Sequence, residues 1–220
     1  MKPALPLNEA ERLQLLYQLQ ILDTQAEPEF DALTKLAALI CQSEISVISL
    51  IDKDRQWFKA RLNIEDPETT RETSFCAHAI LQPEQLTYVP DASLDPRFAD
   101  NPNVTQNNGI RFYAGAPLLI KPGIALGTLC VVDTKPRQLT EAQQNALILL
   151  AKQAVSLMQS RLLAREKELQ QQTLLTVTEH VPVLLGQIDR QQRYVFCNSK
   201  YSQWFGINPT EAIGRSISEV

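Results

Sequence analysis

The sequence predicts an α/β fold in which a buried sheet lies between two layers of helices. Residues 45–51 and 125–132 are largely apolar at both alternating sets of positions, so these two strands need cover on both faces. Segments whose apolar residues recur at helical spacing lie before and after them in the chain. Two-sided burial between flanking helices is typical of a three-layer α/β/α sandwich, and 44% apolar residues can fill its core.

Two helices are expected ahead of the first strand. Asn8 followed by Glu11 is typical of an N-cap and its N3 carboxylate, and apolar residues of the next turns share one face. Pro28 suits the first turn of a second helix. The apolar positions of that helix are Phe30, Leu33, Ala37, Ile40 and Cys41. This spacing predicts that the second helix docks on the sheet.

The two central strands are expected to be flanked by strands at 56–61 and 111–119. Lys121-Pro122-Gly123 places Pro and Gly where a type II turn requires them, which predicts a hairpin between the last two strands. Residues 73–81 are predicted to form a short helix, and residues 89–109 a long loop rich in Asp, Asn and Pro. A loop of that length in a compact domain is usually functional or mobile.

A long helix is expected from Thr140 to Pro182. Thr140 and Gln143 form a second capping box, and no Gly or Pro interrupts the segment that follows. One set of positions, a column of every seventh residue along the helix, is apolar throughout. A second set, displaced from it by three residues, is apolar only in its first half. One interpretation is that one end of the helix packs on the sheet, and the other is that two copies pair in parallel as a homodimer. The dimer helix would use Ile148, Val155, Met158, Leu162 and Leu169.

The C-terminal segment changes character after the long helix. Residues 183–189 and 193–197 are predicted to form two short strands around a polar turn, and Asn198 is expected to cap a helix over 199–205. The 220 residues exceed the usual size of one domain, about 100 to 150 residues, so two units are expected. Several large apolar side chains of the second unit are expected to be exposed: Tyr201, Trp204, Phe205 and Ile213.

Composition and charge exclude several classes of protein. The net charge of −4 provides no electrostatic footprint for nucleic acid. We find no run of about 20 apolar residues, so no membrane contact is expected and the protein is expected to be cytoplasmic. The four cysteines are isolated in sequence, and with two histidines they predict reduced thiols and no metal site.

Five phrases follow one another in an order that resembles the GAF domains of bacterial sensor proteins: SLIDKDRQWFKA, TRETSFCAHAIL, VPDASLDPRFADNP, IRFYAGAPL and ALGTLCVVD. The later phrase YVFCNSKYSQWFGINPTEAIGRSISEV resembles the opening of a PAS domain and covers roughly its first half. The resemblance implies a GAF domain with a central antiparallel sheet over 1–138, a coupling helix over 139–175 and a truncated PAS domain over 176–220.

The same resemblance implies a signal-input module. Its output domain, a diguanylate cyclase, a cyclic-di-GMP phosphodiesterase or a histidine kinase, would lie beyond Val220, and none of their motifs occurs in the 220 residues. Whether the chain is itself an enzyme therefore stays open.

In GAF domains, irregular connectors form a ligand pocket over one face of the sheet. The resemblance therefore implies candidate lining residues, with a small ligand of unknown identity and no cofactor expected. These are Trp57, Phe58, Phe75, Cys76, His78, Arg111 and Tyr113. Arg111 could instead pair with Asp91, Asp95 or Asp100.

Cys76 leaves two alternatives to a sensor of this kind. Bilin-binding GAF domains place His directly after the anchoring Cys, whereas Ala77 intervenes here before His78. GAF enzymes that reduce free methionine sulfoxide need a second thiol, and Cys76 and Cys130 lie on different elements that could approach one another. A scaffold without a ligand is a further alternative.

Overall fold

The structure is a computed structural model that describes residues 2–219. The chain divides into two compact units, Met1–Leu162 and Leu163–Val220. The boundary falls inside the long helix α5 (Glu141–His180), which contributes residues to both units. The domain boundaries expected at residues 138 and 175 stay predictions.

The first unit is built on an antiparallel sheet. Within residues 2–219 the sheet has six strands in the order β3-β2-β1-β6-β5-β4, and each neighbouring pair is antiparallel. The strands are β1 (Ile45–Ile51), β2 (Arg55–Leu62), β3 (Glu68–Thr70), β4 (Thr87–Val89), β5 (Phe112–Lys121) and β6 (Ile124–Asp133). The predicted central strands are β1 and β6, which pair with each other and are buried along their length. The edge strands β3 and β4 were not predicted, because three residues are too short to show an alternating pattern.

The predicted hairpin joins β5 to β6. Lys121 pairs with Ile124 across the turn, and Gly123 has φ of +74°, the left-handed conformation that a type II turn requires at its third residue. A side chain at Gly123 would meet no neighbouring atom, so its role is conformational.

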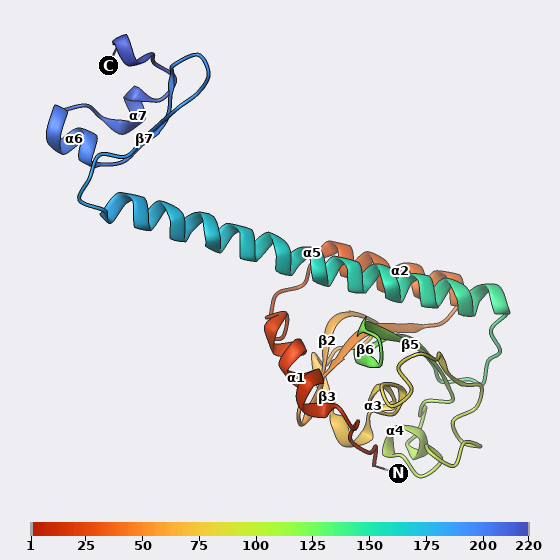
Figure 1. Cartoon of the computed structure of the whole chain (residues 1–220). Coiled ribbons are helices and arrows are strands. Elements are labelled where there is room, and N and C mark those ends of the chain that lie inside the picture. Colours follow the sequence, from red (N-terminus) through yellow and green to blue (C-terminus); the bar gives the residue numbers. More distant parts are fainter. Residues whose placement is uncertain (1, 220) are drawn as a thin grey trace. The chain divides into compact units, whose positions relative to one another are not determined.

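Three helices cover one face of the sheet: α1 (Glu9–Gln18), α2 (Pro28–Cys41) and the first half of α5 (Figure 1). Their apolar faces pack with the strands in one core, as the helical spacing predicted. The capping box of α5 is confirmed, since Thr140 N donates to Gln143 Oε1 at 2.9 Å and Gln143 N donates to Thr140 Oγ1 at 3.3 Å. The Asn8 cap is wrong in detail, because its side chain donates to Gly123 O at 3.0 Å instead of capping α1.

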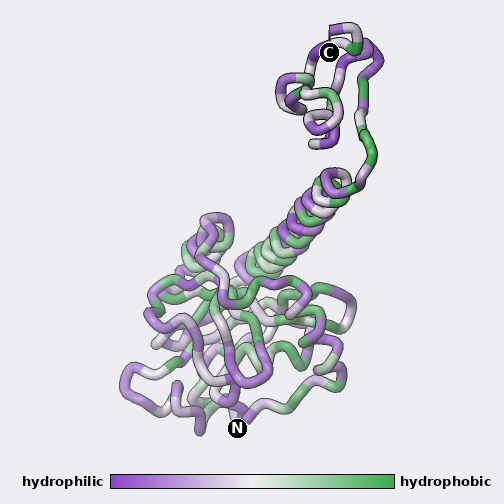
Figure 2. Tube along the Cα trace, turned by 90° about the vertical axis from the view of Figure 1, so that its left-hand side faces the viewer, coloured by the Kyte–Doolittle hydropathy of each residue, from purple (hydrophilic) through white to green (hydrophobic). Residues whose placement is uncertain are grey.

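Short helices and connectors cover the opposite face: η1 (Arg71–Thr73), α3 (Phe75–Ala79) and α4 (Pro102–Thr105). The predicted long loop packs here through Phe98, whose ring stacks on Phe75 with centroids 4.0 Å apart. Apolar residues of β1, β5 and β6 complete this second core. Figure 2 shows hydrophobic and hydrophilic stretches alternating along the trace of the first unit.

Beyond α5, the described part of the second unit holds an antiparallel pair of strands, two short α-helices and a 3-10 turn. These are β7 (Gly186–Ile188), β8 (Tyr194–Cys197), α6 (Lys200–Phe205), α7 (Pro209–Ala212) and η2 (Ile217–Glu219). The predicted strands and helix are confirmed in position. Asn198 does not cap the helix, because its side chain accepts from Leu185 N at 3.2 Å and donates to Thr178 O and Val183 O at 2.9 Å. Trp204, Phe205 and Ile213 are exposed, as expected, whereas Tyr201 is half-buried beside the rings of Tyr194 and Phe205.

By length and composition, α5 alone among the helices of residues 2–219 could cross a membrane. This finding is weak, because a core helix of a globular unit meets the same criterion. Five residues of α5 are buried in the first unit: Leu147, Ala151, Ala154, Val155 and Met158.

Candidate functional site

A cavity of about 270 Å³ lies between the sheet and the connectors that carry α3. Four of the seven predicted residues line it: Phe58, Phe75, Cys76 and Tyr113. They come from β2, α3 and β5, and residues 103–110 of the long connector close the other side. A hollow is thus present between the connectors and one face of the sheet, and ligand binding in it stays a prediction.

Two cysteines meet at the buried end of this cavity. The Sγ atoms of Cys76 on α3 and Cys130 on β6 lie 3.7 Å apart, and both side chains are buried. Tyr113 Oη lies 3.4 Å from Cys76 Sγ and 3.4 Å from Thr128 Oγ1. Thr128 Oγ1 lies 3.3 Å from Ser49 Oγ, which extends the polar contacts into β1. Five polar side chains thus form one connected cluster inside an otherwise apolar core.

The sequence raised the approach of Cys130 to Cys76 as an alternative, but it did not identify Ser49 and Thr128 as members of the site. A signal was present, because Ser49 and Thr128 are polar residues inside strands that were predicted to be buried on both faces. They pair directly across β1 and β6, a register that the sequence pattern did not reveal. Gly115 also belongs to this arrangement, since a Cβ there would stand 2.1 Å from Tyr113 Oη.

The two thiols differ in their pKa. Burial acts to raise the pKa of Cys76, but hydrogen bonds from Cys130, Ser49, Thr128 and Tyr113 outweigh it and lower this pKa to about 6. Burial and the neighbouring Cys76 raise the pKa of Cys130 well above its usual value. Hydrogen bonds within the cluster therefore favour the thiolate form of Cys76 over that of Cys130.

The lining of the cavity is mainly apolar and carries a few polar groups. Among the described residues that line it, none is Asp, Glu, Lys, Arg or His. Hydrogen-bonding groups come from Gln56, Ser74, Asn103 and Gln106. Ser74 is already engaged, since its hydroxyl contacts Gln56 Oε1 and accepts from Ala77 N at 2.9 Å to cap α3. Such a lining suits an uncharged guest.

Three predicted residues lie outside the cavity lining. Trp57 packs in the core on the helix side of the sheet, because adjacent strand residues point to opposite faces and Phe58 takes the cavity side. The His78 ring makes an edge contact with Phe98, with centroids 4.9 Å apart. Arg111 donates through Nη1 to Val104 O at 2.7 Å and Ile110 O at 3.1 Å. This guanidinium therefore holds the long connector, in place of the carboxylate partner that we considered.

The proposed dimer residues of α5 have three different environments. Val155 and Met158 are buried in the core of their own unit. Ile148 and Leu162 are partly buried against that core, and Leu169 is 64% exposed. The interpretation that one end of α5 packs on the sheet is therefore correct for its first half, and pairing of two copies stays a prediction.

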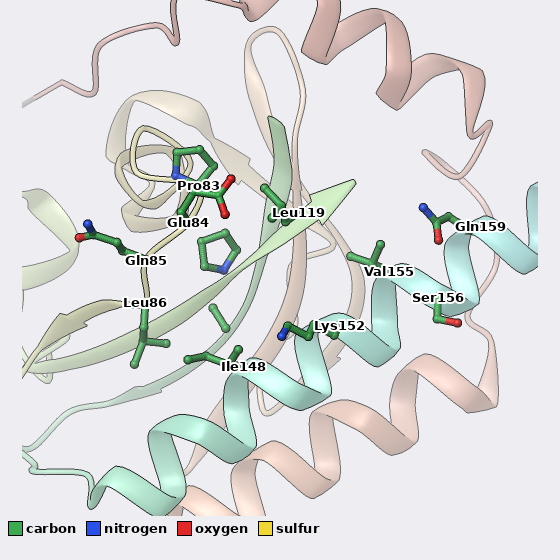
Figure 3. A pocket seen from close by; sticks show the side chains of 12 residues that line it. Pro83, Glu84, Gln85, Leu86, Leu119, Ile148, Lys152, Val155, Ser156 and Gln159 are labelled. Carbon is green, nitrogen blue, oxygen red and sulfur yellow. The ribbon is translucent and has the colours of Figure 1, made fainter. Parts of the chain in front are cut away.

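A second hollow, of about 490 Å³, runs between α5, β5 and the segment before β4 (Figure 3). Ile148, Lys152 and Val155 of α5 form one wall, and Leu119 of β5 and the segment 83–86 stand opposite. Glu84 on this rim accepts from Gly123 N at 2.9 Å, which ties the segment to the hairpin.

Within the described part of the chain, no group of three or more His, Cys, Asp or Glu residues could hold a metal ion.

Comparison with known families places two domains on the chain. A sequence model of the GAF domain matches residues 25–157, more than half of the chain, and a model of the PAS fold matches residues 178–220. Both matches fall where the phrases of the sequence predicted them. The cavity and all of its lining residues lie within the first match.

One curated relative is a cyclic di-GMP phosphodiesterase of Pseudomonas aeruginosa. It is 44% identical to the chain over 135 residues, which are 61% of the chain and 23% of that protein. The chain thus spans about a quarter of the length of this relative.

Solved structures share the fold at low sequence identity. The GAF domain of an Acinetobacter phosphoenolpyruvate-protein phosphotransferase is 17% identical with a TM-score of 0.50, covering 71% of this chain and 95% of its own. A type II free methionine-R-sulfoxide reductase from Thermoplasma acidophilum is 12% identical with a TM-score of 0.44, covering 60% and 96%. The first likeness shows the fold alone, and the second carries no argument about this chain.

Proposed function

Because this chain belongs to the GAF domain family, we propose that it is the sensory input module of a bacterial signalling protein. In this proposal a small molecule binds in the cavity beneath α3, and its occupancy is passed through α5 to the PAS segment and to an output domain. The observation that carries the proposal is the cavity itself, which lies on one face of the sheet and is lined mainly by apolar and aromatic side chains with a few hydrogen-bonding groups.

The ligand that suits this cavity is small and uncharged. A volume of about 270 Å³ lies just below the usual range for drug-sized ligands, so the guest is of amino-acid or nucleobase size, without a phosphate. An anion would lose its hydration without finding a cationic partner among the lining residues. Neutral amides, purine and pyrimidine bases and small alcohols fit these constraints.

Cyclic di-GMP turnover is the output that we propose for the whole protein. It is supported by 44% identity to part of a cyclic di-GMP phosphodiesterase. A diguanylate cyclase or a histidine kinase would be driven by the same kind of input module. We place the protein in the cytoplasm, since its four cysteines are free thiols.

Transmission through α5 is proposed to require a homodimer. The support is the apolar seven-residue column, whose last member, Leu169, is exposed beyond the first unit. A second copy would cover this residue.

Thermal unfolding of the 220-residue protein tests the ligand proposal. We expect a neutral compound, in a panel of free bases, amides and small alcohols, to raise the melting temperature, and cyclic nucleotides to leave it unchanged. A ligand at 100 times its Kd stabilises by about 2.7 kcal/mol, which corresponds to roughly 5 to 10 °C for a protein of this size.

Two tryptophan variants locate the binding site. Ile110→Trp fills the cavity beneath α3 and is expected to abolish the shift, whereas Ser156→Trp fills the hollow of Figure 3 and is expected to retain it. A shift that survives Ile110→Trp would place the ligand elsewhere. Silence of the whole panel would favour a scaffold without a ligand.

A thiol-dependent reductase is the second candidate, because Cys76 and Cys130 are in contact. Reduction of free methionine sulfoxide would consume two thiols and yield methionine, a disulfide and water. Turnover with a dithiol reductant that is lost in Cys76→Ser would establish this activity. A bilin chromophore has less support, since Cys76 is buried and the cavity is small for a tetrapyrrole.

A further inference from the structure

The contact between Cys76 and Cys130 joins two elements that are far apart in sequence. Cys76 lies on α3, a five-residue helix between irregular connectors, and Cys130 lies in the central strand β6. Their Sγ atoms are 3.7 Å apart, and a disulfide bond is about 2.05 Å long. Closing the bond requires an approach of about 1.7 Å, which a short helix between connectors can supply more readily than a central strand.

The hydrogen-bonding environment prepares one of the two thiols for reaction. Tyr113 Oη and Cys130 Sγ both lie within hydrogen-bonding distance of Cys76 Sγ, and the pKa of Cys76 is lowered to about 6. A thiolate is the nucleophilic form of cysteine, so Cys76 is the attacking residue. Cys130 retains its proton and is placed as the resolving thiol.

A small oxidant can reach this pair through the cavity. Both sulfur-bearing side chains line it, and its wall extends outward to Gln106, which is exposed. Hydrogen peroxide is little larger than water, and a space of about 270 Å³ admits it together with solvent.

We propose that Cys76 and Cys130 are a reversible peroxide-reactive site that closes a disulfide between α3 and β6. Cys76 thiolate attacks one oxygen of hydrogen peroxide, the O–O bond breaks, and hydroxide leaves, so Cys76 becomes a sulfenic acid. The Cys130 sulfur then attacks the Cys76 sulfur, the S–O bond breaks, and the Cys130 proton leaves with the hydroxyl group as water. In total, one thiolate and one thiol are oxidised to a disulfide, and one peroxide is reduced to water and hydroxide, which takes up a proton from solvent.

Oxidation at this position changes the cavity. The bond draws α3 toward β6 at the buried end of the space, so the oxidised protein offers a smaller site. The inference goes beyond the proposed sensory function, because disulfide formation needs no ligand and is measured without one.

Thiol counting on the 220-residue protein tests the proposal. Reduced protein is treated with a small excess of hydrogen peroxide at pH 7, denatured in N-ethylmaleimide, and its adducts are counted by intact mass. We expect the count to fall from four to two and to return to four after dithiothreitol. Peptide mapping without reductant is expected to link Cys76 to Cys130.

Two sets of variants serve as controls. Cys41→Ser and Cys197→Ser each remove a buried thiol whose pKa is raised. After peroxide, the adduct count of each variant is expected to fall by two, as in the wild type. Cys130→Ser removes the resolving thiol and is expected to leave a dimedone-reactive sulfenic acid on Cys76. Four adducts after peroxide, or a link that involves Cys41 or Cys197, would overturn the proposal. The wild-type measurement decides this even if a variant fails to fold.

Discussion

Single polar side chains decide which face of the sheet carries the cavity. Ser49 and Thr128 are polar residues in two mainly apolar strands, and they pair across β1 and β6 on the side of α3. On the same face Tyr113 reaches Cys76, while Trp57 turns to the helical side and fills the other core. Because adjacent residues of a strand point to opposite faces, a difference of one position separates a residue of the site from a residue of the other core.

A second cluster of single residues predicts a pH dependence of stability. Glu9 pairs with Arg12 at 2.8 Å and with Arg71 at 2.6 Å, and these two guanidinium side chains are only 1% and 7% exposed. Burial acts to raise the pKa of Glu9, but hydrogen bonds and charges from both arginines outweigh it and hold this pKa below its usual 4.5. The stabilisation is therefore complete above about pH 4.5 and is lost as the pH falls through the lower folded-state pKa.

We expect Glu9→Gln to lower the free energy of unfolding by roughly 3 kcal/mol at pH 7, because two buried cations lose their counter-ion. Its urea midpoint is also expected to change less than that of the wild type between pH 5 and pH 3. Glu11→Gln lies on the same turn of α1 and is exposed, so it should change little. Equal effects of the two variants would show that the buried pairs do not stabilise the unit.

At the scale of elements, α5 has two environments along one continuous helix. Its first half supplies Leu147, Ala151 and Met158 to the core beside α2, and most of its later apolar residues are exposed (Figure 1). The seven-residue spacing is the same in both halves, so the pattern indicates an apolar face without saying what covers it. The helix begins at the capping box of Thr140, only a short connector after β6 ends. Its first half therefore lies against the sheet.

We expect Met158→Ala to lower the free energy of unfolding by about 2 to 5 kcal/mol, through lost burial and the cavity that remains. Leu149→Ala is the matched change on the same helix, where the leucine is 64% exposed, and it should cost less than 1 kcal/mol. Chemical denaturation monitored by circular dichroism measures both. A small effect of Met158→Ala would mean that α5 packs loosely on the sheet.

At the scale of the whole molecule, the chain combines a well-packed unit with a lightly packed one. The buried hydrophobic residues of Met1–Leu162 form two cores on the two faces of one sheet. In Leu163–Val220 only Cys197 and Ala212 are buried hydrophobic residues within the described part, and two aromatic side chains, Trp204 and Phe205, are exposed. Partners of the second unit, including a second copy of the chain, are thus expected to cover apolar surface.

We expect Leu169→Glu to weaken self-association at least tenfold, about 1.4 kcal/mol, because a charge would enter the predicted helix pair. Leu163→Glu is the matched control, since that leucine is 65% exposed but lies outside the seven-residue column. Sedimentation equilibrium of both variants and the wild type measures the effect. A wild type that stays monomeric at high concentration, or equal effects of both changes, would contradict pairing through this column.

Local order is what the sequence alone predicts for this protein. Helical spacing, capping boxes, buried strands and the Pro-Gly turn each depend on residues within a few positions of one another, and these predictions are confirmed for α2, β1, β6 and α5. The order of phrases along the chain also predicted both families.

The tertiary structure decided which distant residues meet. Cys76 and Cys130 are separated by 54 positions, and only the register of β6 against β1 and β5 places them together. Arg111 and Asn198 hydrogen-bond to backbone groups of neighbouring segments, which no residue pattern identifies. A buried polar side chain takes whichever partner the packed chain brings within reach, so its role depends on the fold that surrounds it.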